Sequence, residues 1–375
     1  MRYYLIAGEA SGDMHAAGLM KELRKADQGA VFRCWGGDLM QAAGGELVKH
    51  YRDLAYMGFI EVVMNIRTIM NNLGFCKEDL LRFRPDVLIL VDYPGFNLRI
   101  AEFAHRKGLK VVYYISPQVW AWKKSRVYGI RENVDKMLVI LPFEEDFYRK
   151  YDYRVEFVGH PLLDIVNNPS AYEHDTDFRR ANQLGDKPII ALLPGSRKQE
   201  IKRMLPVMVS MAGKFSGYEF VIAGAPSVDP ALYREVKGSD EMRILYRQTH
   251  ELLRHAHAAA VTSGTATLET ALFGVPQVVC YRGSAVSYAI ARRLVDVRYI
   301  SLVNLIMDRQ VVRELIQYEF NEENLEQEMN SILDEGIRSR IMADYGSLRK
   351  KLGGEGASYR AASSICKALG IEPGT

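Results

Sequence analysis

Short apolar runs alternate with longer mixed segments along this chain, and that alternation restricts the fold more than any other feature. The runs are rich in Val, Ile, Leu and Tyr and end at Gly, Asp or Pro, which is typical of buried parallel strands. They cover 3–8, 87–92, 111–116, 137–141, 189–193, 219–223, 243–246, 258–262 and 277–281. Strands that alternate with helical segments predict βαβ units and therefore an α/β fold with parallel sheets.

A polar stretch at 167–188 separates the strands into two series. A chain of 375 residues also exceeds what one core usually needs, since domains of about 150 residues are common. We therefore predict two tandem Rossmann-like, doubly wound domains, at 1–170 and 171–355, with a ligand cleft between them. The sequence is helical from 321 onward. By analogy with other two-domain transferases, 356–375 is expected to form a helix that returns to the first domain.

Bulk properties exclude several classes of protein. The net charge of +3 is nearly balanced, so no attraction to nucleic acid is expected. The four cysteines are scattered without a C-x-x-C pair, which disfavours a zinc site or a disulfide framework and fits a reducing compartment. No apolar stretch reaches the roughly 18 residues of a spanning helix, and the N-terminus does not read as a signal peptide. We expect a cytoplasmic protein that at most lies on a membrane surface.

Two turns in the second half carry the pattern of a phosphate site. In the first, a strand leads through Pro194 into Gly195, Ser196 and Arg197, and a helix begins there. Free backbone N–H groups at a helix start, together with a planar Arg donor fork, suit a diphosphate. Glu200 follows at the spacing of a capping box with Ser196, so part of the motif also reads as ordinary helix-start chemistry.

The second turn repeats this arrangement after the strand at 258–262. Ser263, Gly264 and Thr265 offer hydroxyl and backbone donors at a helix N-terminus. Glu269 lies about one helical turn further on within an apolar stretch, where an ionised carboxylate needs a partner, and the vicinal hydroxyls of a ribose would serve. Gly224 ends the strand at 219–223 and is predicted to border the base. Nucleotide binding, most simply of a UDP-sugar, follows from these turns.

The first strand ends in a different kind of turn. Glu9, Ser11 and Gly12 lie between Gly8 and Asp13 at the start of a helix. The two acidic residues would repel a phosphate, so the turn suits a hydroxylated sugar better than a diphosphate. The alternative is an ordinary capped turn between strand and helix. The sequence lacks G-x-G-x-x-G, so this is not a dinucleotide fingerprint.

The order of these motifs resembles one family, lipid-A-disaccharide synthase, over nearly the whole chain. The matching segments are GEASGD at 8–13, MGFIEV at 57–62, DYPGFN at 92–97, SPQVWAW at 116–122, VGHPL at 158–162, LPGSRKQEI at 193–201 and SGTATLE at 263–269. The resemblance implies a GT-B glycosyltransferase. Its expected reaction moves 2,3-diacylglucosamine from UDP-2,3-diacylglucosamine to 2,3-diacylglucosamine 1-phosphate, with inversion, release of UDP, and neither metal nor cofactor.

Such a displacement needs a base and a group that stabilises the leaving diphosphate. Asp92 ends a buried strand at the edge where α/β sites form, so it is the first candidate for the base, with Glu9 in reserve. Many relatives carry an Asp where this chain has Gly95. Arg197 is predicted to stabilise the leaving group. Family motifs also suggest that Asn97 and Asn304 contact substrate.

The segment 54–75 is expected to meet acyl chains. It is strongly apolar with one narrow polar stripe, and its methionines give a deformable surface. The predicted acyl-binding residues are Met57, Phe59, Ile60, Val63, Met64 and Ile66. On composition alone a buried helix is the favoured alternative, but acylated substrates and the inner-membrane surface, on its cytosolic side, follow from the family resemblance.

Two other functions stay open at this point. A soluble sugar-nucleotide transferase or 2-epimerase would share the fold, and a non-catalytic nucleotide-binding protein would bind UDP without turnover. Asp92 at a strand end and the apolar segment disfavour both. The sequence leaves the oligomeric state open, and a homodimer is among the assemblies that it allows.

Overall fold

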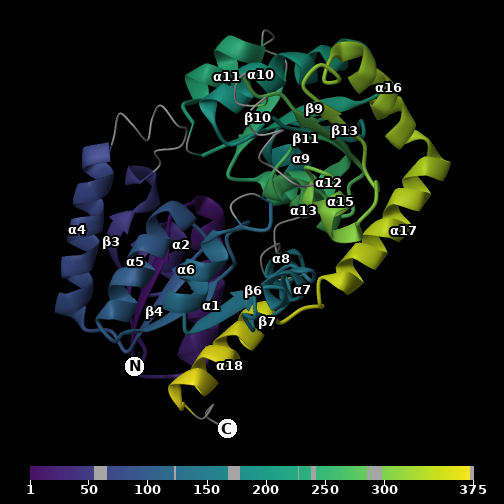
Figure 1. Cartoon of the computed structure of the whole chain (residues 1–375). Coiled ribbons are helices and arrows are strands. Elements are labelled where there is room, and N and C mark those ends of the chain that lie inside the picture. Colours follow the sequence, from purple (N-terminus) through teal and green to yellow (C-terminus); the bar gives the residue numbers. More distant parts are fainter. Residues whose placement is uncertain are drawn as a thin grey trace. The chain divides into compact units, whose positions relative to one another are not determined.

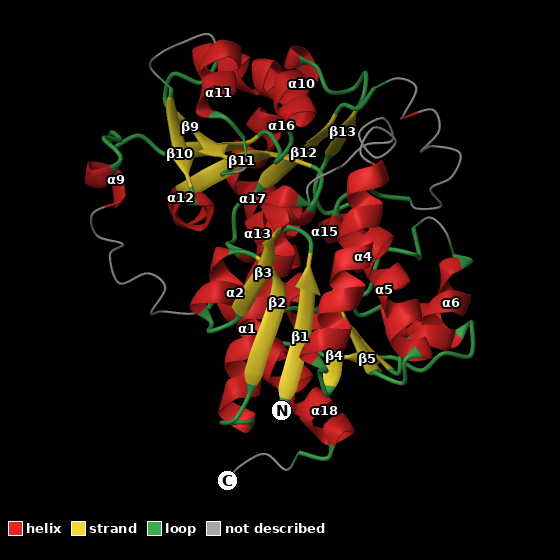
Figure 2. Cartoon of the chain, turned by 90° about the vertical axis from the view of Figure 1, so that its left-hand side faces the viewer, coloured by secondary structure: helices red, strands yellow, loops and turns green. Residues whose placement is uncertain are grey.

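The computed structural model describes residues 1–54, 66–121, 124–167, 178–226, 228–237, 242–284, 288 and 298–371 (Figure 1). The chain divides into two compact units. Unit 1 is Met1–Asp164 together with Leu352–Thr375, and unit 2 is Ile165–Lys351. The sequence had suggested divisions after 170 and 355. Each unit is a parallel sheet with helices around it, which confirms the predicted α/β class (Figure 2).

Unit 1 contains a seven-stranded sheet in the order β3-β2-β1-β4-β5-β6-β7. The strands are β1 (Arg2–Ala7), β2 (Val31–Gly36), β3 (Glu46–His50), β4 (Val87–Val91), β5 (Lys110–Tyr114), β6 (Lys136–Val139) and β7 (Glu156–Phe157). The helices are α1 (Ala10–Ala26), α2 (Asp38–Ala42), α4 (Ile66–Phe83), α5 (Pro94–Arg106), α6 (Arg126–Asn133), α7 (Glu144–Arg149), α8 (Leu162–Val166) and α18 (Ala357–Leu369). A 3-10 turn, η1, covers Tyr51–Asp53.

Unit 2 contains a six-stranded sheet in the order β10-β9-β8-β11-β12-β13. Its strands are β8 (Ile189–Leu193), β9 (Glu219–Gly224), β10 (Arg243–Tyr246), β11 (Ala256–Thr262), β12 (Gln277–Tyr281) and β13 (Glu314–Ile316). Its helices are α9 (Phe178–Ala181), α10 (Lys198–Val209), α11 (Pro230–Lys237), α12 (Thr249–His255), α13 (Thr265–Leu272), α15 (Leu302–Met307), α16 (Glu322–Leu333) and α17 (Glu335–Lys351), with a 3-10 turn, η4, at Ser210–Gly213.

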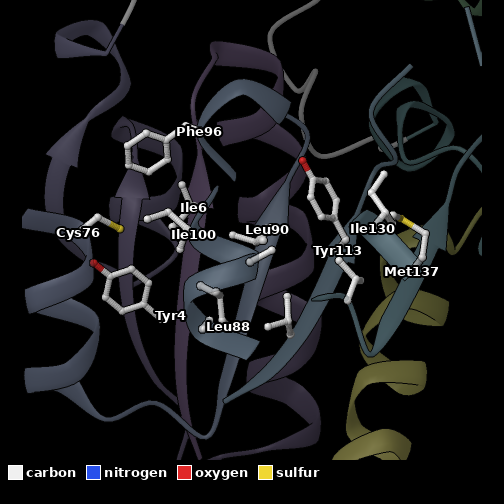
Figure 3. Packing of buried hydrophobic residues seen from close by; sticks show 14 of the residues in the cluster. Tyr4, Ile6, Cys76, Leu88, Leu90, Phe96, Ile100, Tyr113, Ile130 and Met137 are labelled. Carbon is white, nitrogen blue, oxygen red and sulfur yellow. The ribbon is translucent and has the colours of Figure 1, made fainter. Parts of the chain in front are cut away.

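The central strands are apolar throughout because helices cover both faces of each sheet. All five residues of β4 are buried, as are all five of β8. On one face of unit 1, side chains of α4, α5 and α6 pack against β1, β4 and β5. Figure 3 shows part of this cluster, where Tyr4, Ile6, Leu88, Leu90 and Tyr113 are in the packed layer. Burial of this apolar surface is the main force that holds the unit together.

The sequence did not reveal β2, β3, β7 or β13. β2 carries Arg33 in its middle, and the charge breaks the apolar run. Arg33 is tolerated because its guanidinium donates to Asp79 at 2.7 Å and also pairs with Glu46. β3 is an edge strand without a fully buried residue, and β7 and β13 are two and three residues long. Such strands lack the continuous apolar signal of a central strand.

The strand order identifies the edge at which ligands bind in each sheet. In unit 1 the order reverses direction between β1 and β4, and in unit 2 between β8 and β11. At such a switch point, the connections after the two adjacent strands run to helices on opposite faces of the sheet. A crevice therefore forms at the carboxyl ends of the two strands. The turns that follow β1, β4, β8 and β11 therefore lie where α/β folds bind ligands.

The C-terminal helix α18 belongs to unit 1, where it packs along α1. Asp164 caps its first turn, because its carboxylate accepts hydrogen bonds from the N–H groups of Gly356, Ala357 and Ser358 at 2.6, 3.2 and 2.9 Å. Arg360 adds a hydrogen bond from its Nε to the carbonyl oxygen of Val158 at 2.8 Å. These contacts fix α18 to the end of the first stretch of unit 1.

Replacing Asp164 by Ala should lower the free energy of unfolding by about 1–2 kcal/mol, because three helix N–H groups lose their acceptor. Urea unfolding followed by circular dichroism measures this change. Asp146→Ala is the matched control, since Asp146 only pairs with Arg149 on an exposed surface and should cost less than half as much. Equal losses in the two variants would contradict the role of Asp164.

Candidate functional site

The switch point of unit 1 brings Glu9 and Asp92 together. Ala7, the last residue of β1, pairs with Val91, the last residue of β4. The chain after each strand therefore starts at the same level of the sheet. Two of the residues predicted for catalysis thus come from adjacent strand ends, as the sequence pattern indicated.

The backbone after β4 is strained and closely packed. Asp92 and Tyr93 both have left-handed backbone conformations, with φ of 44° and 51°, which L-residues adopt only when the surroundings hold them there. The Tyr93 ring lies directly over Gly8, where an added Cβ would come 2.2 Å from the Tyr93 Cγ. Gly8 is therefore required by this close approach, and any side chain there would displace the turn.

Asp92 has an unusual acidity. Burial raises the pKa of the half-buried Asp92 carboxyl to about 7, and the negative charge of Glu9 adds to the increase. A hydrogen bond from the Tyr93 backbone acts in the opposite direction. A carboxylate whose pKa lies near the working pH can take a proton from a hydroxyl group more effectively than one with an ordinary pKa. Perturbed acidity of this kind is common at functional sites.

The remaining residues of the first turn differ in role. Glu9 precedes α1 and its side chain does not cap the helix. Asp13, in contrast, is buried and accepts hydrogen bonds from the N–H groups of Gly37, Leu39 and Met40 at 2.7, 3.1 and 3.1 Å. Its carboxylate thus caps α2. Ser11 is half-buried in the first turn of α1.

Gly12 and Asn97 serve the packing of unit 1. A Cβ at Gly12 would approach the Ala7 Cβ to 3.2 Å, so glycine lets α1 lie close to β1. Asn97 is fully buried, and its Nδ2 donates to the carbonyl oxygens of Ile6, Val91 and Asp92 at 3.4, 3.3 and 2.7 Å. The sequence predicted that Asn97 contacts substrate. Its amide nitrogen donates to the backbone at the strand ends, and the substrate contact stays a prediction.

In unit 2, the turn after β8 has the backbone form of an anion site. Gly195 has φ of 110°, a conformation that favours glycine. Glu200 fills the space next to it and accepts hydrogen bonds from the Ser196 N–H at 3.1 Å and from Arg197 Nη1 at 2.8 Å. A carboxylate of the chain thus occupies the donors that were predicted for a diphosphate. Arg197 remains about half exposed.

The turn after β11 leaves Gly264 and Thr265 exposed at the N-terminus of α13. The Ser263 hydroxyl donates to the Ile300 carbonyl oxygen at 2.9 Å, so it holds the neighbouring loop. Glu269 has a side chain that is only 14% exposed, and His250 Nε2 lies 3.7 Å from its Oε2. The sequence argued that Glu269 needs a partner but did not identify His250, because the contact joins α12 to α13 and no local spacing reveals it.

Two other predicted residues in unit 2 have structural contacts. Gly224 ends β9 beneath the Tyr246 ring, which an added Cβ would approach to 2.5 Å. Asn304 is fully buried, with Nδ2 bound to Val312 O at 2.8 Å and Glu314 Oε1 at 2.9 Å. Its Oδ1 accepts the N–H groups of Val311 and Val312. Asn304 therefore anchors the loop before β13 and presents no free group to a ligand.

The predicted acyl-binding residues Met57, Phe59, Ile60, Val63 and Met64 lie outside the described residues, and only the backbone of Ile66 is described, at the start of α4. No helix in the described part of the chain is long and apolar enough to cross a membrane. Among the described residues, no group of three or more His, Cys, Asp or Glu side chains could hold a metal ion.

The two parallel sheets, each with helices around it, define the class of this protein as GT-B. Two solved structures share the fold. The UDP-GlcNAc 2-epimerase from Neisseria meningitidis bound to UDP-GlcNAc has a TM-score of 0.71 at 13% identity and covers 98% of this chain and 100% of its own. The glycotransferase of kitacinnamycin has a TM-score of 0.67 at 14% identity and covers 98% and 99%.

Sequence comparison narrows the class to one family. Residues 3–368 match the family described as Lipid-A-disaccharide synthetase. The lipid-A-disaccharide synthases of Syntrophus aciditrophicus and Myxococcus xanthus are 42% and 40% identical, covering 96% and 98% of this chain and 95% and 97% of their own lengths. The chain belongs to the lipid-A-disaccharide synthase family.

Family membership confirms the resemblance found in the motifs and gives the chain the family's activity. It is a glycosyltransferase of lipid A biosynthesis that transfers 2,3-diacylglucosamine from its UDP derivative to 2,3-diacylglucosamine 1-phosphate. The epimerase alternative shares only the fold, at 13% identity.

If the charge of Glu9 raises the Asp92 pKa, Glu9→Gln should lower that pKa. The ionised form of Asp92 would then persist to lower pH, so the acidic limb of the kcat/KM profile should move to lower pH. Steady-state rates of UDP release between about pH 5 and about pH 9 measure this limb. Glu102→Gln is the control, because Glu102 is exposed and pairs with Arg106 at 2.5 Å on α5. If the acidic limb of the kcat/KM profile moves equally in both variants, or in neither, the effect of Glu9 on the Asp92 pKa is contradicted.

Proposed function

We propose that Asp92 is the general base of this transferase and that the turns after β8 and β11 hold the UDP. In this assignment the Asp92 carboxylate takes the proton of the acceptor 6-hydroxyl. The hydroxyl oxygen bonds to C1 of the donor sugar while the bond from C1 to the β-phosphate oxygen breaks. Attack from the opposite side gives inversion, and UDP leaves with the electron pair.

The observation that carries this proposal is the state of Asp92. It combines a position at the switch point, a strained backbone and a pKa raised to about 7. Glu9 is the other carboxylate at this place, and we assign it an electrostatic role in setting the Asp92 pKa. Ser11 and Gly12 would border the sugar. The fold position alone suggests a ligand, whereas the raised pKa suggests proton transfer.

Unit 2 supplies the donors that would stabilise the leaving group. Arg197, the Ser196 N–H and the exposed N–H groups of Gly264 and Thr265 are the donors that we assign to the diphosphate. Glu200 now accepts from two of them, so a bound diphosphate would take over these hydrogen bonds and release the Glu200 carboxylate toward the ligand.

We assign Glu269 to the ribose hydroxyls, with Gly195 and Gly224 lining the nucleotide. The place of Glu269 in α13, beyond Gly264 and Thr265, supports this assignment, because a carboxylate can accept hydrogen bonds from two vicinal hydroxyls. His250 Nε2 lies 3.7 Å from Glu269 Oε2 and borders the same carboxylate. Ser263 and Asn304 contribute indirectly, through the loops that they hold.

Helix α4 supports association with a membrane surface. Met70 and Leu81 share one face of this helix, and their exposed fractions are 59% and 45%. Exposed arginines at 67 and 82 could meet anionic headgroups. We propose that α4, together with the acyl-binding residues predicted before it, faces the cytosolic side of the inner membrane.

Asp92→Asn should lower kcat by about 100-fold or more, because the base is lost, while the affinity for UDP stays within about twofold. UDP release is measured with and without the 1-phosphate acceptor, which separates transfer from hydrolysis or epimerisation, and UDP binding by calorimetry. Arg197→Ala is the control with the opposite binding result, because loss of the guanidinium should weaken the affinity for UDP. Retained turnover in Asp92→Asn would remove Asp92 from the mechanism.

Asp92→Asn should also be more stable than the wild-type protein above pH 7. The folded-state pKa of Asp92 is raised from 3.8 to about 7, so the stability that the protonated carboxyl contributes is complete below pH 3.8 and lost as the pH rises through 7. Asn cannot ionise. The Tm difference between the variant and wild type should therefore grow from pH 5 to pH 8.

Met70→Ser with Leu81→Ser should reduce binding to vesicles that contain anionic phospholipid. The two residues are separated by about three helical turns, so they lie on one face of α4. Flotation measures the bound fraction. The control pair is Tyr128→Ser with Tyr318→Ser, which are 52% and 89% exposed on other elements. Equal binding by both double variants would contradict the assignment of α4.

A further inference from the structure

The carbonyl oxygen of Asp92 is the meeting point of two buried side chains. Tyr113, on β5, donates its hydroxyl hydrogen to this oxygen at 2.6 Å. Asn97, on α5, donates from Nδ2 to the same oxygen at 2.7 Å. Both side chains are fully buried. Figure 3 shows the Tyr113 ring within the core cluster of unit 1, with its hydroxyl group at the end of the ring.

These contacts act where the backbone is strained. With φ of 44°, Asp92 has a conformation that an L-residue leaves unless other contacts hold it. Two hydrogen bonds onto one carbonyl oxygen, from two different elements, fix the direction of the peptide plane. The direction of the Cα–Cβ bond is thereby fixed as well, and with it the place of the carboxyl group.

We propose that Tyr113 and Asn97 are positioning residues, which hold the Asp92 carboxyl in the geometry that proton transfer requires. This inference rests on the proposed role of Asp92 as the base. A positioning residue contributes through geometry, since a displacement of about 1 Å at a reacting group can cost about 100-fold in rate. Neither residue need touch the substrate.

The two residues differ in what else they hold. Asn97 also contacts the carbonyl oxygens of Ile6 and Val91, so its replacement disturbs the ends of β1 and β4. The Tyr113 hydroxyl has the Asp92 carbonyl as its hydrogen-bond acceptor. Tyr113→Phe removes this donor and keeps the ring in the core. It is therefore the sharper test.

The matched control is Tyr3→Phe. Tyr3 is also fully buried in the same sheet, and its hydroxyl donates to Asp27 Oδ2 at 3.1 Å. It pairs with Val87 at the start of β4, the end opposite to Asp92. Both variants lose one tyrosine hydrogen bond and should lower the Tm by similar amounts. Only Tyr113→Phe should lower kcat, by about tenfold, with the KM for the UDP-sugar and the affinity for UDP within about twofold of wild type.

The outcomes separate the positioning role from the role of the base. If Asp92→Asn is inactive and Tyr113→Phe keeps the kcat of Tyr3→Phe, the positioning role is overturned while the base assignment stands. If Asp92→Asn retains turnover, the proposed base is wrong. A further loss on adding Tyr113→Phe to Asp92→Asn would show that Tyr113 acts independently of Asp92, which also overturns the inference. Should Tyr113→Phe not fold, Asn97→Ser is measured in the same way, and an unchanged kcat overturns it.

Discussion

The parallel pairing of β1 with β4 and of β8 with β11 determines where chemistry is available in each unit. Main-chain hydrogen bonds set the register of these strands, and covering helices bury β4 and β8 completely. Because their carboxyl ends finish at one edge, residues distant in the sequence become neighbours there. Glu9 and Asp92 are brought together in this way, and so are the turns after β8 and β11. The chemistry of each turn then follows from the few residues directly after each strand.

The strand ends of the two units differ in their electrostatic character. Those of unit 1 carry acidic side chains, whereas the turns of unit 2 carry hydrogen-bond donors. In unit 1, the Glu9 and Asp92 carboxylates lie close together and partly shielded from water. The pKa of Asp92 rises because ionisation is unfavourable in that environment. In unit 2, backbone N–H groups and Arg197 create a place that attracts negative charge, and Glu200 occupies it. The Glu200 carboxylate thereby gives two of these donors an acceptor within the chain.

Much of this arrangement could be predicted from the sequence, and the exceptions have physical reasons. The central strands and the residues at their ends were found because buried parallel strands are continuously apolar. β2 was missed because Arg33, paired with Asp79 and Glu46, interrupts that pattern. Asn97 and Asn304 were predicted to contact substrate because they lie in segments that resemble the family's motifs. A sequence cannot distinguish an amide that faces a ligand from one that binds backbone carbonyls. The contacts of Tyr113 and His250 join separate elements, so only the fold reveals them.

The capping of α18 by Asp164 affects the order in which the two units can finish folding during synthesis. Unit 1 is built from two separate stretches, Met1–Asp164 and Leu352–Thr375, whereas unit 2 is continuous from Ile165 to Lys351. On the ribosome, domains usually fold in the order in which they emerge. Here unit 1 must keep the surface of α1 that receives α18 uncovered until Ala357–Leu369 has left the exit tunnel. Unit 2 has all of its elements earlier. A segment made after the whole of unit 2 thus completes the unit that was begun first.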